Sequence, residues 1–345
     1  DERVKYWLPV DQYIGGIEHA ILHLLYSRFW TRVMRDLGLV TLDEPFAKLL
    51  TQDMVLNGIY FRKTEAGRIA YYNPTEVEER DDGTGGRIVV LLADGQPVES
   101  GGMGTMSKSK NNGVDPQMLV DTLGADTARL FTMFTAPPEQ TLEWSDEGVQ
   151  GASRFLKRIW RAVHAHVAGG LAGPVVVAEL NEPRKALRRQ VHQTLAKVSD
   201  DIGRRRTFNT AIAAVMELLN ALNRAEAATP DDRAVVQEAL DLTVLMLSPI
   251  VPHICHRLWN VLGHDGAIID QPWPLPDPVA LVADTREIVV QVNGKVRGRV
   301  TVAATASESD VRAAALADDN VQRFVAGQSV RKVIVVPGKL VNVVV

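Results

Sequence analysis

Apolar residues recur at steps of three and four along much of the second half of the chain, which is typical of amphipathic helices. One such stripe runs through residues 187–202 and another through residues 208–222. Thr229-Pro230 adds a helix-start signal, because a hydroxyl residue caps the first amides and proline fits the first turn. The segments expected to be helical are 153–167, 187–202, 208–222, 230–247 and 253–262. Together they predict a helix bundle over residues 151–270.

The first half of the chain changes pattern twice. Residues 17–37 have helical spacing, whereas residues 57–102 consist of short β-type runs separated by turns rich in glycine and aspartate. Asp115 then precedes Pro116, which predicts a capped helix start, and Asp126 is expected to cap the helix that follows. The first half is therefore expected to be an α/β region with a β-rich insertion.

A proline-rich segment, residues 271–284, follows the bundle and indicates a linker. Behind it, Asn293-Gly294 is a strong hairpin signal, since both residues tolerate the positive φ that a two-residue turn requires. The strands expected here are 287–292, 295–302, 330–336 and 340–345, and the helices are 307–317 and 320–326. The last sixty residues therefore predict a separate α/β module.

Composition narrows the class of protein. The 345 residues are 46% apolar and 23% charged, which suits two or three globular domains and excludes wholesale disorder. No stretch approaches the about 18 uncharged apolar residues of a membrane span, and no signal peptide is recognisable. The single cysteine, Cys255, allows neither an internal disulfide nor a cysteine-based zinc site, so a cytoplasmic location is expected. The chain starts with Asp1 rather than Met, which suggests a piece of a longer chain.

Charge is distributed unevenly. The net charge is −4, yet residues 151–225 contain 13 Lys and Arg against five Asp and Glu. This basic stretch indicates a polyanionic partner, although a solvated helix face would have the same composition. Within it, Arg204, Arg205 and Arg206 can either satisfy the last carbonyls of a helix or contact a nucleic-acid backbone.

The glycine-studded loop at residues 101–113 contains the most informative chemistry. Its centre combines two lysines with two serines, and such a loop can fold over a triphosphate, with lysine as a point charge. Glycine upstream and Asn111-Asn112-Gly113 downstream are expected to be hinges. The loop lacks the residue order and the preceding strand of a Walker A motif, which disfavours a phosphate-loop NTPase. Taken alone, a segment of this kind is more often a flexible basic surface loop than a catalytic one.

Its context points to a known family. Met106-Ser107-Lys108-Ser109 resembles the KMSKS signature of class I aminoacyl-tRNA synthetases. The upstream Gly15-Gly16-Ile17-Glu18-His19-Ala20 resembles an element of leucyl-tRNA synthetases. Further matches occur in the family's order at residues 124–127, 142–144, 154–158, 207–211, 248–253, 292–297 and 335–340. The chain is similar to the bacterial type of this family from end to end.

The resemblance implies a fold of the α/β plus all-α class. It would combine the second half of a Rossmann-like catalytic domain with an anticodon-binding helix bundle and a small α/β C-terminal domain. The implied parts are the half catalytic domain (1–56), a β-rich leucine-specific insertion (57–102), the KMSKS loop and stem-contact region (103–150), the anticodon-binding bundle (151–270), the linker (271–284) and the tRNA-binding domain (285–345).

The resemblance also implies an activity. The family uses ATP and Mg²⁺ to convert leucine to leucyl-adenylate and then transfers leucine to tRNA-Leu. The implied partners are ATP, leucine and tRNA-Leu, without a membrane, and the full-length enzyme would be a monomer. Mg²⁺ would come with the substrate, so no metal site is expected in this chain. His19 and His23 share a helical face, but they lack a third ligand and an intervening glutamate.

Site roles follow residue by residue from the resemblance. Lys108 would be catalytic, neutralising charge on the phosphates. His23 would lie near the leucine side chain, and the glycines would let the nucleotide approach the backbone while Glu18 accepts from a ribose hydroxyl. The residues implied in ATP and adenylate binding are Gly15, Gly16, Glu18, His19, Met106, Ser107, Lys108 and Ser109. Those implied in tRNA binding are Arg204, Arg205, Arg206, Lys295, Arg297 and Lys339.

Two departures from the family pattern matter. Thr105 stands where the signature has its first lysine, so a weaker contact to the ATP phosphates or to the resting position of the loop is expected, while Lys108 keeps the central charge. None of the eight histidines occurs in a His-x-Gly-His sequence, the family's other ATP-binding signature. The chain is therefore expected to be a C-terminal portion that lacks this motif and the editing domain, and to be inactive alone. The alternative is a non-catalytic tRNA-binding chain or a subunit of a split synthetase.

Overall fold

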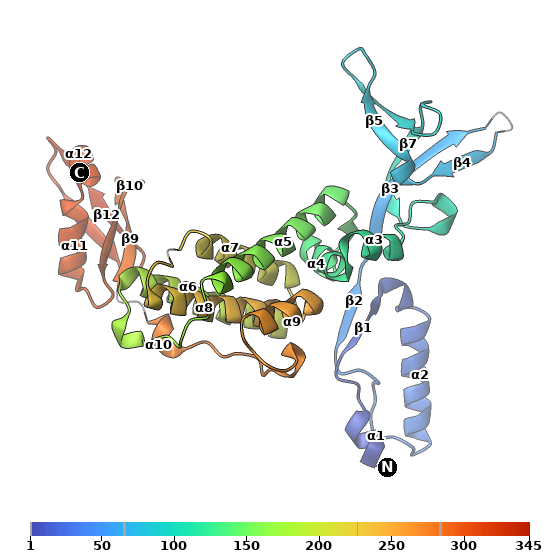
Figure 1. Ribbon diagram of the computed structural model, residues 1–345, viewed down its shortest axis with the longest axis horizontal. Coiled ribbons are helices and arrows are strands. Elements are labelled where there is room, and N and C mark those ends of the chain that lie inside the picture. Colours follow the sequence, from blue (N-terminus) through green and yellow to red (C-terminus); the bar gives the residue numbers. More distant parts are fainter. Residues whose placement is uncertain (1, 65–66, 226, 283–284) are drawn as a thin grey trace. The chain divides into compact units, whose positions relative to one another are not determined.

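The computed structural model describes residues 2–64, 67–225, 227–282 and 285–345 (Figure 1). The start of the first predicted part, two residues of the insertion, one of the bundle and the end of the linker lie outside these ranges. The chain forms two compact units. The first comprises Asp1–Leu180 and Thr194–Leu275, and the second comprises Asn181–Gln193 and Pro276–Val345.

The first unit begins with a small α/β region. Strands β1 (Tyr13–Gly16) and β2 (Leu49–Gln52) pair in parallel, and α1 (Glu2–Trp7), η1 (Ile17–His19) and α2 (His23–Asp36) accompany them. The helix predicted over 17–37 is divided, because a 3₁₀ turn and a break precede α2. Of the residues of α2, Leu24 and Thr31 are buried, so most of its apolar side chains face solvent.

The β-rich region predicted over 57–102 is confirmed. Strand β3 (Val55–Lys63) pairs with β4 (Ile69–Tyr72), β7 (Glu99–Thr105) and the short β8 (Leu142–Glu143). A separate antiparallel pair, β5 (Val77–Asp81) and β6 (Arg87–Leu91), follows the 3₁₀ turn η2 (Pro74–Glu76). Strand β7 ends at Thr105, so the sheet leads directly into the loop at residues 106–113 (Figure 1). The expectation that no strand precedes this loop is therefore wrong, and its residue order alone distinguishes it from a Walker A motif.

The loop contains the 3₁₀ turn η3 (Lys108–Lys110). The helices after it confirm one predicted cap and correct another. Asp115 caps α3 (Pro116–Leu123) by accepting from the backbone N–H of Gln117. Asp126 does not cap its own helix, α4 (Ala125–Thr135), whose N-cap is Gly124.

The Asp126 carboxylate instead accepts from the backbone N–H of Ile254 at 2.7 Å and bonds His253 Nδ1 at 2.9 Å. Both residues lie in the first turn of α9 (Pro252–Val261). Arg129 of α4 donates to the carbonyls of Pro249 and Ile250 just before it. Two side chains of α4 therefore form hydrogen bonds with the segment before α9 and with the first turn of α9, more than 120 residues later in the chain.

The predicted bundle consists of α5 (Asp146–Ala168), α7 (Phe208–Leu222), α8 (Pro230–Leu247) and α9, with η6 (Ile268–Asp270) after them. Its core is almost completely shielded from solvent, and the side chains of Leu218 and Leu240 are at most 1% exposed. Helix α8 starts where the Thr-Pro signal predicts, and Thr229 and Asp232 add a reciprocal capping box there. Cys255 is fully buried on α9.

Helix α6 (Glu182–Asp200) follows η4 (Val177–Glu179) and lies partly in each unit. It does not stop at a simple cap but continues into a π-helical turn, η5 (Asp201–Arg205). The turn ends at Arg206, which has a left-handed backbone with φ of 55°. Such π turns are rare and often occur at functional sites.

The second unit contains the predicted α/β module. After α10 (Pro278–Leu281), β9 (Thr285–Val292) and β10 (Lys295–Ala303) form the hairpin around Asn293-Gly294, where both residues have positive φ. With β11 (Lys332–Val336) and β12 (Leu340–Val344), the sheet order is β10-β9-β12-β11. Helices α11 (Glu308–Ala317) and α12 (Asp319–Val325) pack with its buried valines into one core. The fold class is therefore as the sequence predicts, α/β regions joined to a helical bundle.

Candidate functional site

The loop after β7 has a defined conformation. The backbone N–H of Met106 still pairs with Val55 O, which continues the sheet for one residue. Ser107 then caps the single 3₁₀ turn η3, because its hydroxyl accepts from the backbone N–H of Lys110. Asn111 ends the turn in a left-handed conformation, with φ of 49°. We refer to residues 105–113 as the KMSKS-like loop.

The two lysines of this loop differ in their surroundings. Lys108 is exposed, and none of the described residues forms an ion pair with it. Lys110 is partly buried, and its Nζ lies 3.7 Å from the position that a Cβ on Gly104 would occupy. Thr105 is exposed at the end of β7. Lys108 is therefore a free cation available to an anionic ligand, flanked by the exposed Ser109 and the partly buried Met106.

The glycine pair lies at the end of β1, directly before η1. A Cβ on Gly16 would lie 2.2–2.5 Å from atoms of the Glu18 carboxyl group, so the bare Cα leaves room for that group to fold back. Neither glycine has a positive φ, so the backbone conformation does not itself require glycine at either position. Glu18 and His19 are both exposed.

The two histidines are neighbours, as their spacing predicts. The ring centroids of His19 and His23 lie 6.1 Å apart with an interplanar angle of 81°. His23 also stacks on Tyr13, with centroids 5.5 Å apart, and Tyr13 contacts Phe46. Across the described ranges, no group of three or more His, Cys, Asp or Glu side chains could hold a metal ion.

The structure thus forms two separate clusters, one at the end of β1 and one in the KMSKS-like loop. In the part of the chain that the structure describes, no hydrogen bond or ion pair joins them. Each cluster gathers its own predicted residues: Gly15, Gly16, Glu18, His19 and His23 in the first, and Met106, Ser107, Lys108 and Ser109 in the second.

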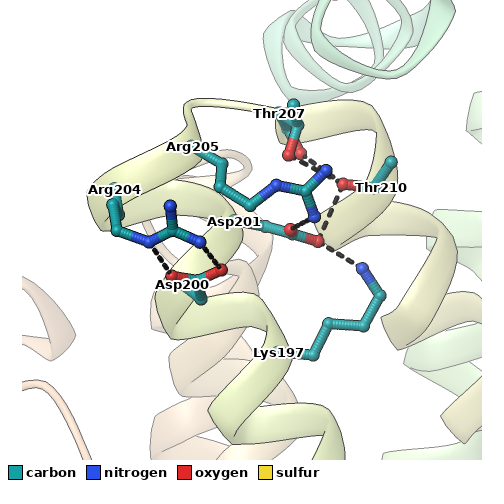
Figure 2. A network of polar contacts seen from close by, with 7 residues as sticks. All are labelled: Lys197, Asp200, Asp201, Arg204, Arg205, Thr207 and Thr210. Carbon is teal, nitrogen blue, oxygen red and sulfur yellow. Dashed lines mark hydrogen bonds and ion pairs between the residues drawn. The ribbon is translucent and has the colours of Figure 1, made fainter.

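Figure 2 shows the arginine cluster at the end of α6. Arg204 forms a two-point ion pair with Asp200, which lowers the pKa of that carboxyl. Arg205 pairs with Asp201, a carboxylate that is fully buried. Arg206 is partly buried, and its backbone N–H donates to Asp201 O, but its side chain forms no hydrogen bond or ion pair with any described residue.

Asp201 is the centre of this network. It accepts from Lys197, Arg205 and Thr210, and Thr210 also contacts Thr207 (Figure 2). Burial alone raises the pKa of Asp201, but these partners outweigh burial and hold the pKa below its usual value of 3.8. Two of the three predicted tRNA-binding arginines therefore also hold the π turn together.

The basic residues predicted on the C-terminal module are dispersed. Lys295 is exposed directly after the β9–β10 turn, and Lys339 is exposed in the β11–β12 turn. Arg297 lies over the Phe324 ring, 4.0 Å from its centroid. Arg299 pairs with Glu287. Proteins contact nucleic-acid phosphates with such cations, and they contact bases with exposed aromatic rings such as Phe324.

Comparisons with known proteins agree with the motif resemblance. The family described as "Anticodon-binding domain of tRNA ligase" matches residues 184–312. The leucine–tRNA ligase of Nitrosospira multiformis is 63% identical over the whole chain, and that of Marinobacter nauticus is 61% identical over 99% of it. A crystal structure of a ternary complex of Agrobacterium radiobacter LeuRS, tRNA and LeuAMS matches 97% of the chain with a TM-score of 0.72 and 29% identity.

The chain is therefore related to leucine–tRNA ligases along its entire length, and the resemblance drawn from its motifs is confirmed. It spans about two fifths of the length of the curated relatives, 40% in both of these cases. Among the described residues, no helix has both the length and the apolar character needed to cross a membrane.

Sequence reasoning missed three side chains at these sites. Asn112, predicted to be part of a hinge, is completely buried and hydrogen-bonded. Asn73 and Asn57 contact the same loop from the β-rich region. The Asn-Asn-Gly sequence did mark the turn, but nothing in it distinguishes a flexible hinge from an anchored corner.

Proposed function

We propose that this chain acts as the KMSKS-bearing and tRNA-binding part of a leucine–tRNA ligase, which activates leucine with ATP and transfers it to tRNA-Leu. The observation that carries the proposal is the unpaired cation of Lys108 on an anchored loop, in a chain related throughout to leucine–tRNA ligases. A fixed loop matters because a charge stabilises a transition state best when it needs no reorganisation.

In this mechanism ATP enters as its Mg²⁺ complex, a substrate rather than a resident cofactor. The ammonium of Lys108 neutralises charge on the phosphates while the leucine carboxylate attacks the α-phosphorus. The Glu18 carboxylate accepts from a ribose hydroxyl, and the open backbone at Gly15 and Gly16 allows close approach of the nucleotide. His19 and His23 line the pocket, with His23 towards the leucine side chain.

The basic residues are proposed to bind tRNA. The guanidinium group of Arg206 has no partner among the described residues and is the best phosphate contact in its cluster, whereas Arg204 and Arg205 are partly neutralised by Asp200 and Asp201. Lys295, Arg297 and Lys339 would add contacts from the C-terminal module.

The test is leucine-dependent pyrophosphate exchange by a full-length enzyme that contains these residues. Replacing Lys108 by Ala is expected to slow exchange roughly a hundredfold, about 3 kcal/mol of transition-state stabilisation, and to leave the KM for leucine nearly unchanged. Lys157→Ala, a basic residue of the bundle, serves as the control. Exchange within twofold of the parent would contradict the role of Lys108. Binding of tRNA without any exchange by the parent would favour the non-catalytic alternative.

A further inference from the structure

Three asparagines, Asn57, Asn73 and Asn112, hold the backbone of the KMSKS-like loop, and we call them the asparagine clamp. Asn112 is 0% exposed and lies within the loop itself. Its Oδ1 accepts from the backbone N–H of Ser107 at 2.8 Å, and its Nδ2 lies 3.2 Å from Gly104 O. Asn57 Nδ2 donates to the backbone carbonyl of Asn112 at 3.1 Å. The upstream side of the loop is therefore fixed from inside the sheet.

Asn73 fixes the downstream side. Its Nδ2 donates to Asn111 O at 3.1 Å and to Gly113 O at 2.9 Å, so one side-chain amide spans the corner of the loop. This residue lies between β4 and η2, about forty positions earlier in the chain. The β-rich region thereby contacts the loop directly.

The orientation of the Asn73 amide is set by its own surroundings. Its Oδ1 accepts from the backbone N–H and the hydroxyl of Thr75, and its backbone N–H donates to Glu76 in a capping box. The Nδ2 group is consequently the end that faces the loop. The reverse orientation would place an oxygen against two carbonyl oxygens.

Lys108 lies between the two fixed sides. Ser107, the N-cap of η3, is held by Asn112, and the turn closes with a bond from the Asn111 N–H to Lys108 O at 3.3 Å. Asn111 O is in turn held by Asn73. The backbone position of Lys108 therefore depends on hydrogen bonds at both ends of a turn only three residues long.

We propose that Asn73 is a positioning residue for Lys108, and that through it the β-rich region sets where the cation of the KMSKS-like loop lies. The inference rests on the proposed function, since it assigns that cation to phosphate neutralisation. Asn73 itself contacts no reacting atom in this proposal.

The first test needs no activity and uses the 345-residue chain. Asn73→Asp keeps an oxygen for Thr75 and for the helix cap, but it removes both donors and puts an anionic oxygen against two carbonyls. Amide exchange at residues 107–111 and tryptic cleavage after Lys108 and Lys110 are expected to accelerate on the order of tenfold. Asp82→Ala is the matched control, because Asp82 accepts from backbone amides in the β5–β6 turn of the same region. Unchanged protection in Asn73→Asp would overturn the proposal.

The second test uses full-length enzyme and a double-mutant cycle. Asn73→Asp is expected to lower kcat for pyrophosphate exchange several-fold, with the KM for leucine unchanged, and to have no further effect once Lys108 is Ala. An equal loss in the Lys108→Ala background would mean a general structural role and would overturn the proposal. If the parent enzyme shows no exchange, the proposed function fails, whereas the first test still decides whether Asn73 holds the loop.

Discussion

Helices α2 and α8 both contain many apolar residues, yet the rest of the chain buries far more of α8 than of α2. Ten of the 18 residues of α8 are buried, whereas two of the 14 residues of α2 are. The difference lies in the neighbours rather than in the helices, because α8 packs among other helices of the bundle while α2 accompanies a pair of strands. Apolar periodicity thus predicts a helix, but only the surrounding layers decide whether that helix stabilises the fold.

Polar contacts compensate for little of this difference. Glu44 receives Arg28 and Arg32 from α2, and its hydrogen bonds with these arginines lower its pKa to about 2. These pairs are exposed, so salt and solvent weaken them. The surface ion pairs around α2 therefore add little stability, whereas the bundle is held by its buried core.

The largest expected effect tests the contrast between the bundle, here represented by α7, and α2. Leu218 of α7 is fully buried, and Leu218→Ala is expected to lower the free energy of unfolding by roughly 2–5 kcal/mol because it removes a side chain and leaves a cavity. Leu25 of α2 is 56% exposed, and Leu25→Ala should change it by less than about 0.5 kcal/mol. Denaturant unfolding of the 345-residue chain measures both. Similar losses would mean that α2 is covered in solution.

A smaller effect is expected for a polar contact between α4 and α9, the bonds of the Asp126 carboxylate. Asp126→Ala removes the acceptor for the first turn of α9 and should cost about 2–3 kcal/mol, because the freed donors are partly buried. Asp115→Ala is the matched control, since it removes a cap within its own exposed helix start and should cost about 1 kcal/mol. Equal losses would show that the long-range bond adds nothing to local capping.

The next effect depends on pH. The folded-state pKa of Asp201 is lowered, so its stabilisation is complete above the ordinary value of 3.8 and is lost as the pH falls from that value through the lower pKa of the folded state. Asp201→Asn is therefore expected to lower the free energy of unfolding by about 1–2 kcal/mol at pH 7 and by progressively less below pH 3.8. Asp200→Asn, in an exposed pair, should have little effect at either pH. A difference that does not depend on pH would contradict this role of the buried carboxylate.

The smallest effect concerns RNA binding by the 345-residue chain, which is expected to bind tRNA without catalysing pyrophosphate exchange. Arg206→Gln should reduce the slope of log K against log salt by about 0.7–0.9, the value of one phosphate contact, and leave stability unchanged. Arg205→Gln should mainly reduce stability, because it leaves Asp201 with one cationic partner fewer. A salt slope unaffected by Arg206→Gln would remove that residue from the interface.

Local signals in the sequence predicted local structure well. The helix start at Thr229-Pro230, the Asp115 cap and the Asn293-Gly294 turn follow from residue type and immediate neighbours. Features that depend on distant partners were missed. The carboxylate of Asp126 meets a helix 127 residues later, and Asn73 meets the corner of a loop about forty residues later. Periodicity and capping rules use neighbouring residues only, so they cannot predict contacts that form when distant elements pack together.

The same limit applies to the candidate site. The motif predicted which residues form the KMSKS-like loop, and the structure adds that Asn112 anchors a corner expected to be a hinge. The Arg204, Arg205 and Arg206 cluster illustrates a second limit. Its composition suggested three equivalent cations, but acidic residues one turn away pair with two of them.

The burial of Cys255 has a practical consequence for spectroscopy. Burial and, to a lesser extent, the charge of Asp126 raise the pKa of this single thiol well above its usual value, so almost no thiolate is available to alkylating reagents in the native chain. The rate at which Cys255 is labelled therefore measures how often α9 opens to solvent. A cysteine introduced on the surface, for example at Thr105, can then be labelled with a fluorophore without a competing native site.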